Sequence, residues 1–266
     1  MNSSSARSVD CDMRPRNLKN KPLVEAILEV KWQLATESGG APVDPNYRLF
    51  FGRFYDRVKN EYPAYEALPA ATIPDVMAAY VAQYRFRLKE NGWPLIQIGP
   101  GMLTLNDTDS YDWPDFEKRA HWALERLFES HPGRLQIQSL LLRYIDAVEV
   151  DFFKEDVTGF LRDKLKITLT YPESLFQSGQ VEHAPSALVL QSAFHSQTPK
   201  GTVQLKFARG KVKQKESLVW ETSTSSSGKD LPPLPDEFSA WLSAAHAITD
   251  DWFFKLIDGE LLRRFE

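Results

Sequence analysis

Residues 22–34 read PLVEAILEVKWQL, and this stretch decides the class of fold that the chain can adopt. Apolar side chains recur at every second position, from Ala26 through Leu28 and Val30 to Trp32, and mostly polar side chains stand between them. Because successive side chains of a strand point to opposite sides of a sheet, this period predicts a strand with one covered face and one polar face. Such one-sided strands are typical of antiparallel sheets.

Two helices and a hairpin follow this strand. Aromatic side chains at helical spacing predict a helix over 46–60. Asn91-Gly92 lies between two apolar-rich runs and is a strong hairpin signal. Asp112 can cap a helix that ends at Pro132-Gly133. A third strand is predicted at 102–105, and loops are predicted around Gly39-Gly40 and over 63–74.

The same order of elements then starts again. A long strand is predicted over 135–150, and Asp156 caps a short helix that reaches Leu165. A last helix is predicted over 234–262, with a break at Gly259, and the Ser-rich stretch 223–229 before it is expected to be a linker. Between the short helix and this Ser-rich stretch, three strands are predicted at 187–196, 202–209 and 216–222. Turns at Pro199-Lys200-Gly201 and Arg209-Gly210-Lys211 separate them.

Each half of the chain therefore reads strand, helix, three strands, helix. We divide the sequence into a disordered tail at 1–20, an N-terminal half at 21–133 and a C-terminal half at 134–266. The alternating strands favour the α+β class, with a largely antiparallel sheet and helices packed on one face. Pseudo-duplicated architectures such as the TATA-binding-protein fold and the helix-grip fold look similar at this level of detail.

The composition is that of an ordinary globular protein, and it narrows the classes of function. The chain has 266 residues and a formal net charge of −4, so it lacks the strong basic excess of many nucleic-acid-binding proteins. Cys11 is the only cysteine, which excludes an internal disulfide and a zinc site built on thiolates. No apolar run reaches the ~20 residues of a membrane span, and residues 1–20 lack a signal-peptide core. We expect a cytoplasmic protein without membrane contact.

Three segments together resemble a known family. They are Pro22-Leu23-Val24-Glu25-Ala26, then Leu103-Thr104-Leu105-Asn106 followed by Tyr111, Trp113 and Phe116, and finally Leu142-Arg143-Tyr144-Ile145-Asp146. The pattern is similar to that of a large, sporadically distributed family of uncharacterised bacterial proteins, and beyond residue 150 it matches in layout alone. The family motif usually ends in Asn where this chain has Asp146, which weakens any role that requires an amide there. The family has no established activity, and its sporadic occurrence implies mobile elements, toxin–antitoxin loci or phage defence.

The sequence carries no motif of a known catalytic or cofactor site. It lacks HExxH, GxSxG and the phosphate-binding patterns GxxxxGK[ST] and GxGxxG. The histidines are dispersed, and we expect His121 and His246, on the predicted helices, to satisfy local hydrogen bonds where helix meets sheet. We therefore expect no cofactor and no bound metal, and we assign no catalytic residue.

Two charged residues and the polar sides of the strands form the candidate binding site. Glu25 and Arg143 lie among apolar neighbours, and charges so placed usually pair or bind a ligand. The polar strand positions can share one open sheet face of net positive charge, with the basic loop at 209–215 near its rim. Structural salt bridges and a solvated face are the plainer interpretation. The candidate residues are Glu25, Arg85, Arg87, Lys89, Arg143, His195, Lys206 and Arg209.

These features favour a non-enzymatic binding or regulatory protein that holds a protein partner on the open sheet face. A toxin or a defence effector is one class of partner that the family resemblance implies. The first alternative is a nucleic-acid- or nucleotide-binding module, because clustered Lys and Arg contact phosphates. The second is an enzyme with a dispersed site near Arg143, Glu25 and His195. The sequence leaves open the oligomeric state, including a homodimer.

Overall fold

The fold was determined from a computed structural model that describes residues 18–36, 40–74, 77–108, 111–152, 154–183 and 185–266. The strands are β1 (Leu23–Trp32), β2 (Ala35–Thr36), β3 (Pro42–Val43), β4 (Ala64–Ala67), β5 (Tyr84–Arg87), β6 (Leu95–Gly99), β7 (Met102–Asp107), β8 (Ile137–Glu149), β9 (Val189–Gln197), β10 (Lys200–Val212) and β11 (Lys215–Ser227). The α-helices are α1 (Tyr47–Val58), α2 (Trp113–Ser130), α3 (Val157–Leu165), α4 (Phe238–Ile257) and α5 (Glu260–Phe265).

One antiparallel sheet of nine strands organises the fold, in the order β4-β5-β6-β7-β1-β8-β11-β10-β9. The predicted α+β class with a largely antiparallel sheet is therefore confirmed. The two long strands β1 and β8 lie side by side at the centre. From β1 the sheet continues through β7, β6 and β5, and from β8 it continues through β11, β10 and β9.

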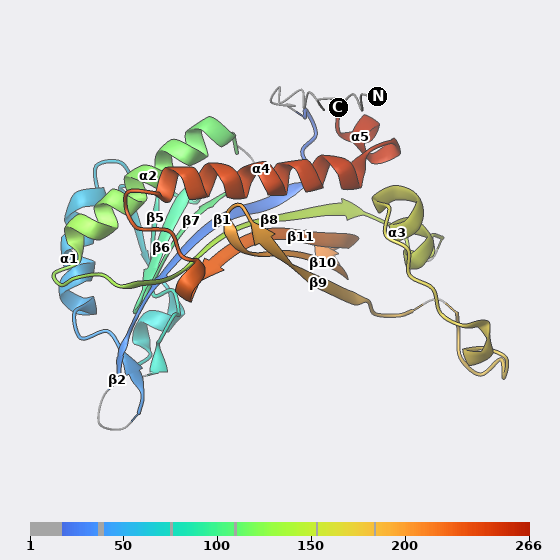
Figure 1. Ribbon diagram of the computed structural model, residues 1–266, viewed down its shortest axis with the longest axis horizontal. Helices are drawn as coiled ribbons and strands as arrows, with labels where there is room; N and C mark the ends of the chain where they lie inside the picture. Colours follow the sequence, from blue (N-terminus) through green and yellow to red (C-terminus); the bar gives the residue numbers. More distant parts are fainter. Residues whose placement is uncertain (1–17, 37–39, 75–76, 109–110, 153, 184) are drawn as a thin grey trace, which may run out of the picture.

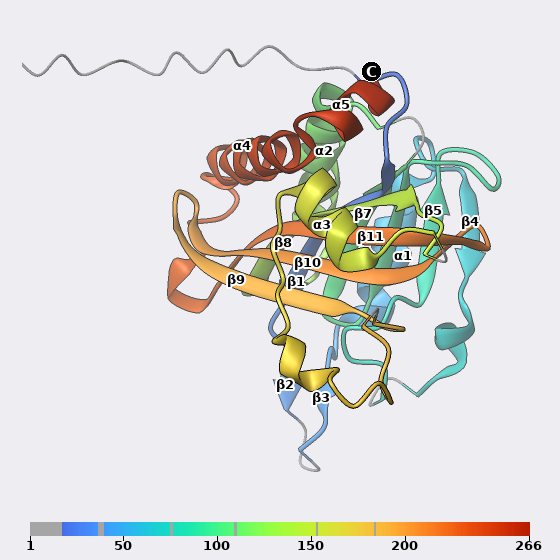
Figure 2. The same cartoon turned by 90° about the vertical axis from the view of Figure 1, so that its right-hand side faces the viewer.

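The helices pack on one side of this sheet, which arches beneath them (Figure 1). The apolar positions of β1 face this side, and Leu28 and Trp32 are buried against Phe50 of α1 and Phe116 of α2. The prediction of one covered face per strand holds for β1 because its alternation is strict. Figure 2 shows that β2, β3 and the segment before β9 project on the other side.

Two apolar cores fill the space between helices and sheet. The first joins β1, β5, β6 and β7 to α1, α2 and the beginning of α4, where Phe238 and Trp241 are buried. The second joins β10 and β11 to α3, α5 and the end of α4, where Leu256 and Ile257 are buried. Helix α4 spans both cores, so it ties the two sides of the sheet together.

The Ser-rich stretch 223–229 is not a linker, and that prediction was wrong. Ser223 to Ser227 complete β11 and pair with β8, and residues 223–225 pair with β10 as well. The buried side chains of Thr224 and Ser226 point to the helix side, where Ser226 Oγ accepts a hydrogen bond from Trp241 Nε1 at 2.8 Å. Low complexity suggested flexibility, but backbone pairing on two sides fixes this segment in the sheet.

Two further local predictions were wrong, those for residues 63–74 and for the β10–β11 turn. Residues 63–74 contain β4 and a short 3₁₀ turn at Pro69–Thr72 instead of a loop. The predicted loop around Gly39-Gly40 lies partly outside the described residues, and the paired strands β2 and β3 flank it. The β10–β11 turn lies at Lys213-Gln214, which both adopt positive φ, because the strands run further than the Arg209-Gly210-Lys211 signal suggested.

The two predicted helix caps differ in their hydrogen bonds. Asp156 caps α3 as predicted and accepts hydrogen bonds from the backbone N–H groups of Thr158 and Gly159. Asp112 stands at the N-cap position of α2 but makes no side-chain capping bond. The predicted tail falls mostly on residues 1–17, outside the described residues. In the described part of the chain, no helix is long and apolar enough to span a membrane.

Candidate functional site

The side of the sheet opposite the helices carries most of the predicted polar positions. Residues paired across neighbouring strands share a face, so the register defines rows of side chains. One row runs from Arg87 through Leu95, Asn106, Ile27, Arg143, Ser223 and Gln204 to Ala193. We call this side the open face, because none of the α-helices in the described ranges packs on it.

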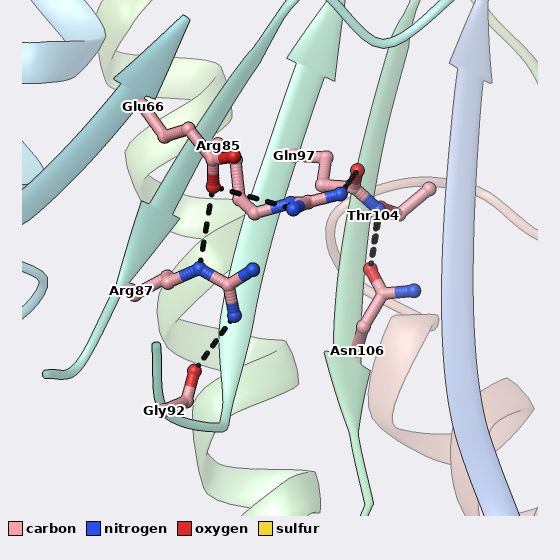
Figure 3. A network of polar contacts seen from close by, with 7 residues as sticks. All are labelled: Glu66, Arg85, Arg87, Gly92, Gln97, Thr104 and Asn106. Atoms are coloured by element: carbon pink, nitrogen blue, oxygen red, sulfur yellow. Dashed lines mark hydrogen bonds and ion pairs between the residues drawn. The ribbon is translucent and has the colours of Figure 1, made fainter. Parts of the chain in front are cut away.

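Ion pairs begin at the β4 edge of the open face (Figure 3). Glu66 Oε2 lies 3.2 Å from Arg85 Nη1 and 3.4 Å from Arg87 Nε. Arg87 Nη1 also donates to the backbone carbonyl of Gly92 at 3.0 Å, which ties the strand to its hairpin turn. Both arginines are therefore committed to contacts within the protein.

The contacts continue toward the centre of the sheet (Figure 3). Arg85 Nη2 donates to Gln97 Oε1 at 3.3 Å, and Gln97 Nε2 donates to Asn106 Oδ1 at 3.4 Å. Thr104 Oγ1 donates to the same Asn106 oxygen at 2.6 Å. Asn106 Nδ2 then donates to Glu25 Oε1 at 2.8 Å. Glu25 and Arg85 thus belong to one polar network that spans five strands.

Two more cations of the open face are paired. Lys31 Nζ lies 2.7 Å from Glu29 Oε1 on the same strand. Lys206 Nζ lies 3.1 Å from Glu221 Oε1, the residue directly opposite on β11. These pairs make the face nearly neutral in its central region, although its cations outnumber its anions. The charged residues with open-face register positions are Lys31, Arg85, Arg87, Arg143, Lys200, Lys206 and Lys215, and Glu25, Glu29, Glu66, Glu149 and Glu221.

Arg143 differs from these paired cations. It lies in the central strand β8, half-buried, between Ile27 of β1 and Ser223 of β11. Leu141 and Ile145 flank it along its own strand on the same face. Its guanidinium makes no hydrogen bond and no ion pair within the part of the chain that the structure describes.

Three carboxylates occupy the diagonal positions around Arg143. The register places Glu25 and Glu29 two residues to either side of Ile27, and Glu221 two residues from Ser223. Diagonal Cα atoms lie roughly 7–8 Å apart, which is within reach of long side chains, but Arg143 forms no ion pair with these carboxylates in the described structure. Each of these carboxylates has another partner, as described above. The charge of Arg143 is therefore balanced nearby while its five N–H donors stay available.

The remaining predicted residues are not gathered around Arg143. His195 lies on the edge strand β9, and three strand spacings, about 14 Å, separate β9 from β8. Lys89 lies in the turn between β5 and β6, where its carbonyl accepts from Gly92 N at 2.9 Å. The structure thus does not assemble the dispersed catalytic group of Arg143, Glu25 and His195.

Arg209 lies on the wrong face for the predicted site. It is paired in register with Leu218, which is buried under the helices. Its guanidinium packs 4.6 Å from the ring centre of Phe152 and its Nε lies 3.5 Å from Glu216. The predicted turn had placed Arg209 in a loop, but β10 continues through it, and strand alternation sends its side chain to the helix side.

A polar cluster on the covered face was not predicted as a unit. The hydroxyl oxygens of Tyr111 and Tyr144 lie 2.7 Å apart, and Tyr144 Oη lies 3.0 Å from His246 Nδ1. The His246 ring stacks on Trp113, with ring centres 3.6 Å apart. The expected hydrogen bond of His246 at the helix–sheet boundary is confirmed. Tyr111, Trp113 and Tyr144 all belong to the segments that resemble the family, which was the available signal.

Burial sets the protonation of this cluster. Desolvation lowers the pKa of His246 to about 4, so its ring is neutral near pH 7. Desolvation also raises the pKa of both tyrosine hydroxyls, and the charge of Asp250 adds to the effect. The Tyr111–Tyr144–His246 chain is therefore a neutral hydrogen-bond network beneath α4.

Asp146 is a second buried polar residue on the covered face. Its carboxyl group makes no hydrogen bond or ion pair with the described residues, and desolvation raises its pKa to about 8. Trp220, its register partner on β11, is also buried, and its Nε1 has no hydrogen-bond partner. Asp146 thus lies at a buried position, where its carboxyl group is mostly protonated at neutral pH.

The three segments that resemble the family meet at the centre of the sheet. Leu23 pairs with Asp146, and Ile27 pairs with both Asn106 and Arg143. Among the described residues, no group of three His, Cys, Asp or Glu side chains is placed to hold a metal ion. Comparison of the chain with models of protein families and with curated proteins finds no match to either. The family resemblance accordingly stays a prediction.

Proposed function

We propose that the open face binds a protein partner and that the partner engages Arg143 at its centre. The unpaired guanidinium is the observation that carries the proposal, since Lys31, Arg85 and Lys206 on the same face all have carboxylate partners. The guanidinium is half-buried and still reaches solvent, and covering it in an interface without hydrogen bonds would be costly. A partner that offers a carboxylate or backbone carbonyl oxygens would satisfy its donors.

The surroundings of Arg143 support the same proposal. Ile27, Leu141 and Ile145 are the aliphatic neighbours of Arg143 on this face, which no α-helix of the described chain covers. Arginines at the centre of an apolar patch, with polar groups around the rim, are typical energetic centres of protein interfaces. The polar network from Glu66 to Glu25 provides such polar groups on the β1 side of Arg143.

The charge distribution favours a protein over a nucleic acid. A polyanion would meet Glu25, Glu29 and Glu221 beside Arg143, and the neighbouring lysines are already neutralised. The strand aromatic residue next to Arg85, Tyr84, does not supply a stacking platform on the open face either. Tyr84 points to the helix side, where its ring stacks on Phe51 with centres 4.1 Å apart.

The strand order supports the further proposal that the chain consists of two similar halves. β1 and β8 each begin one set of strands, and the sets extend from the centre in mirrored order. Such an arrangement suits a saddle of the TATA-binding-protein kind, whose open face holds a partner. The family resemblance adds a toxin or a defence effector as the proposed class of partner.

The test is affinity capture with the full chain, comparing wild type with Arg143→Gln and with Lys118→Gln, an exposed residue of α2. We expect one partner to be recovered with wild type and Lys118→Gln, and its yield to fall about tenfold or more with Arg143→Gln. Equal recovery with Arg143→Gln would contradict the proposal. Substitution of Arg85, Arg87 and Lys206 by Glu is less decisive, because it places new carboxylates beside Glu66 and Glu221.

Nucleic-acid binding gives a different signature in a separate titration. Mixed-sequence RNA and DNA oligonucleotides are titrated at about 50 mM and about 200 mM salt, where phosphate contacts lose affinity steeply. We expect no binding that falls steeply with salt. Tight, salt-sensitive binding that Arg143→Gln weakens would replace the protein partner by a nucleic acid.

A further inference from the structure

The two edges of the sheet are built differently. Edge strand β4 is four residues long, and its Glu66 is held by Arg85 and Arg87. Edge strand β9 is nine residues long, reads VLQSAFHSQ and contains no Lys, Arg, Asp, Glu or Pro. Natural sheets protect their edges with short strands, charges and prolines. β4 has two of these protections, whereas β9 has none of them.

The outer side of β9 presents unpaired backbone groups. The carbonyl of Leu188, just before β9, accepts from Arg209 N on β10 at 3.1 Å. Backbone groups of an antiparallel strand alternate in direction, so every second residue from Val189 turns its N–H and C=O away from β10. In the described chain, β9 pairs with β10 alone. The residues with outward groups are Val189, Gln191, Ala193, His195 and Gln197.

We propose that a second copy of this chain pairs its β9 with this edge, antiparallel, around a two-fold axis at Ala193. In that register the outward groups of Gln191 face those of the partner's His195, and those of Val189 face those of the partner's Gln197. The smallest of these outward-paired residues, Ala193, lies at the axis, so the two strands can approach closely. Because β9 contains no Lys, Arg, Asp or Glu, two copies of it can pair without like-charge repulsion, which favours a second copy of this chain as the partner.

Two exposed apolar side chains fit this pairing. Phe194 is 50% exposed on the helix side, where its ring packs edge-on against Trp252 at 5.5 Å. The register places it diagonal to the partner's Phe194, within reach of an aromatic contact. Val189 is 71% exposed on the open face and would be covered near the end of the new ladder. The interaction leaves Arg143 uncovered in each copy, so this inference goes beyond the proposed partner site.

The oligomeric state of the full chain tests this proposal. Sedimentation over a range of micromolar concentrations is measured for wild type, Ala193→Lys and Ala67→Lys, the matched change at the β4 edge. We expect wild type and Ala67→Lys to dimerise, and the association constant to fall about tenfold or more in Ala193→Lys, which brings two ammonium groups to the axis. A wild type that stays monomeric throughout, or an Ala193→Lys variant that dimerises equally well, would overturn the proposal.

A cross-linking experiment tests the register. Cysteine is introduced at residue 193 or 197 in a Cys11→Ser background, which removes the only native thiol. Paired Cα atoms at the axis would lie about 5.5 Å apart, within disulfide reach. The chain should cross-link through Ala193→Cys and not through Gln197→Cys, whose two copies would lie roughly 27 Å apart. Cross-linking at 197 alone, or at neither position, contradicts the pairing.

Discussion

Arg143 and Asp146 are three residues apart on β8, yet they point to opposite faces of the sheet and differ in burial. Arg143 points to the open face, is half-buried and keeps its charge. Asp146 points to the covered face, is 3% exposed and has a pKa raised to about 8. Neither side chain has a hydrogen-bond or ion-pair partner within the described residues. An unpaired charge thus persists where solvent or a partner can reach it, whereas a sealed site holds the neutral form.

The largest difference between the faces should appear in neighbouring leucines of β8. Leu142 is fully buried in the first core, whereas Leu141 is half-buried on the open face. We expect Leu142→Ala to lower the free energy of unfolding by about 2–5 kcal/mol, because it leaves a cavity in a packed core. Leu141→Ala should cost less than about 1 kcal/mol. Urea unfolding followed by tryptophan fluorescence measures both, and equal losses would mean that the open face is covered.

The pH dependence of stability should come from the covered face. Asp146 has a folded pKa of about 8, above its unfolded value of 3.8, so it contributes stability below pH 4 that is lost as the pH rises through 8. His246 has a folded pKa of about 4, below its unfolded value of 6.5. The protein therefore gains stability from this group as the pH rises from 4 to 6.5. The two effects oppose each other between pH 4 and 6.5. Asp146 alone acts above that range.

We therefore expect wild-type stability to fall by about 2 kcal/mol between pH 6.5 and 8, at about 1.4 kcal/mol per pH unit for one proton. Asp146→Asn removes the titrating group and should flatten this part of the curve. Urea unfolding at both pH values, with Asp151→Asn as a control at an exposed carboxyl group, measures the effect. The same slope in wild type and Asp146→Asn would show that Asp146 is not the group responsible.

The period of the sequence predicted the sheet well, because alternation is a local property of each strand. The order of side chains in β1 fixed which residues of the strand face the helices, and Asp156 was recognised as a cap. Local signals failed where long-range pairing decides. Ser223 to Ser227 resemble a linker in composition, yet β8 and β10 hold them in a ladder. Arg209 was predicted in a turn near the open face, but β10 continues through it and its side chain points to the helix side.

The sequence could predict that several candidate residues share one face of the sheet, but not how their side chains contact one another. Glu25, Arg85, Arg87 and Arg143 do share one face, as the strand parity implied. The sequence could not show that Arg85 and Arg87 are paired with Glu66 while Arg143 is not, because the partners come from other strands. The Tyr111–Tyr144–His246 chain likewise joins three distant segments.

The most direct test of the partner site combines binding and stability in a single substitution. Arg143→Gln should change the free energy of unfolding by less than about 0.5 kcal/mol, because the guanidinium has no internal partner to lose. In the same preparation, titration calorimetry with the captured partner should show affinity reduced about tenfold or more, while Lys118→Gln binds like wild type. Unchanged affinity of Arg143→Gln for that partner would contradict the central claim that the open face binds through Arg143.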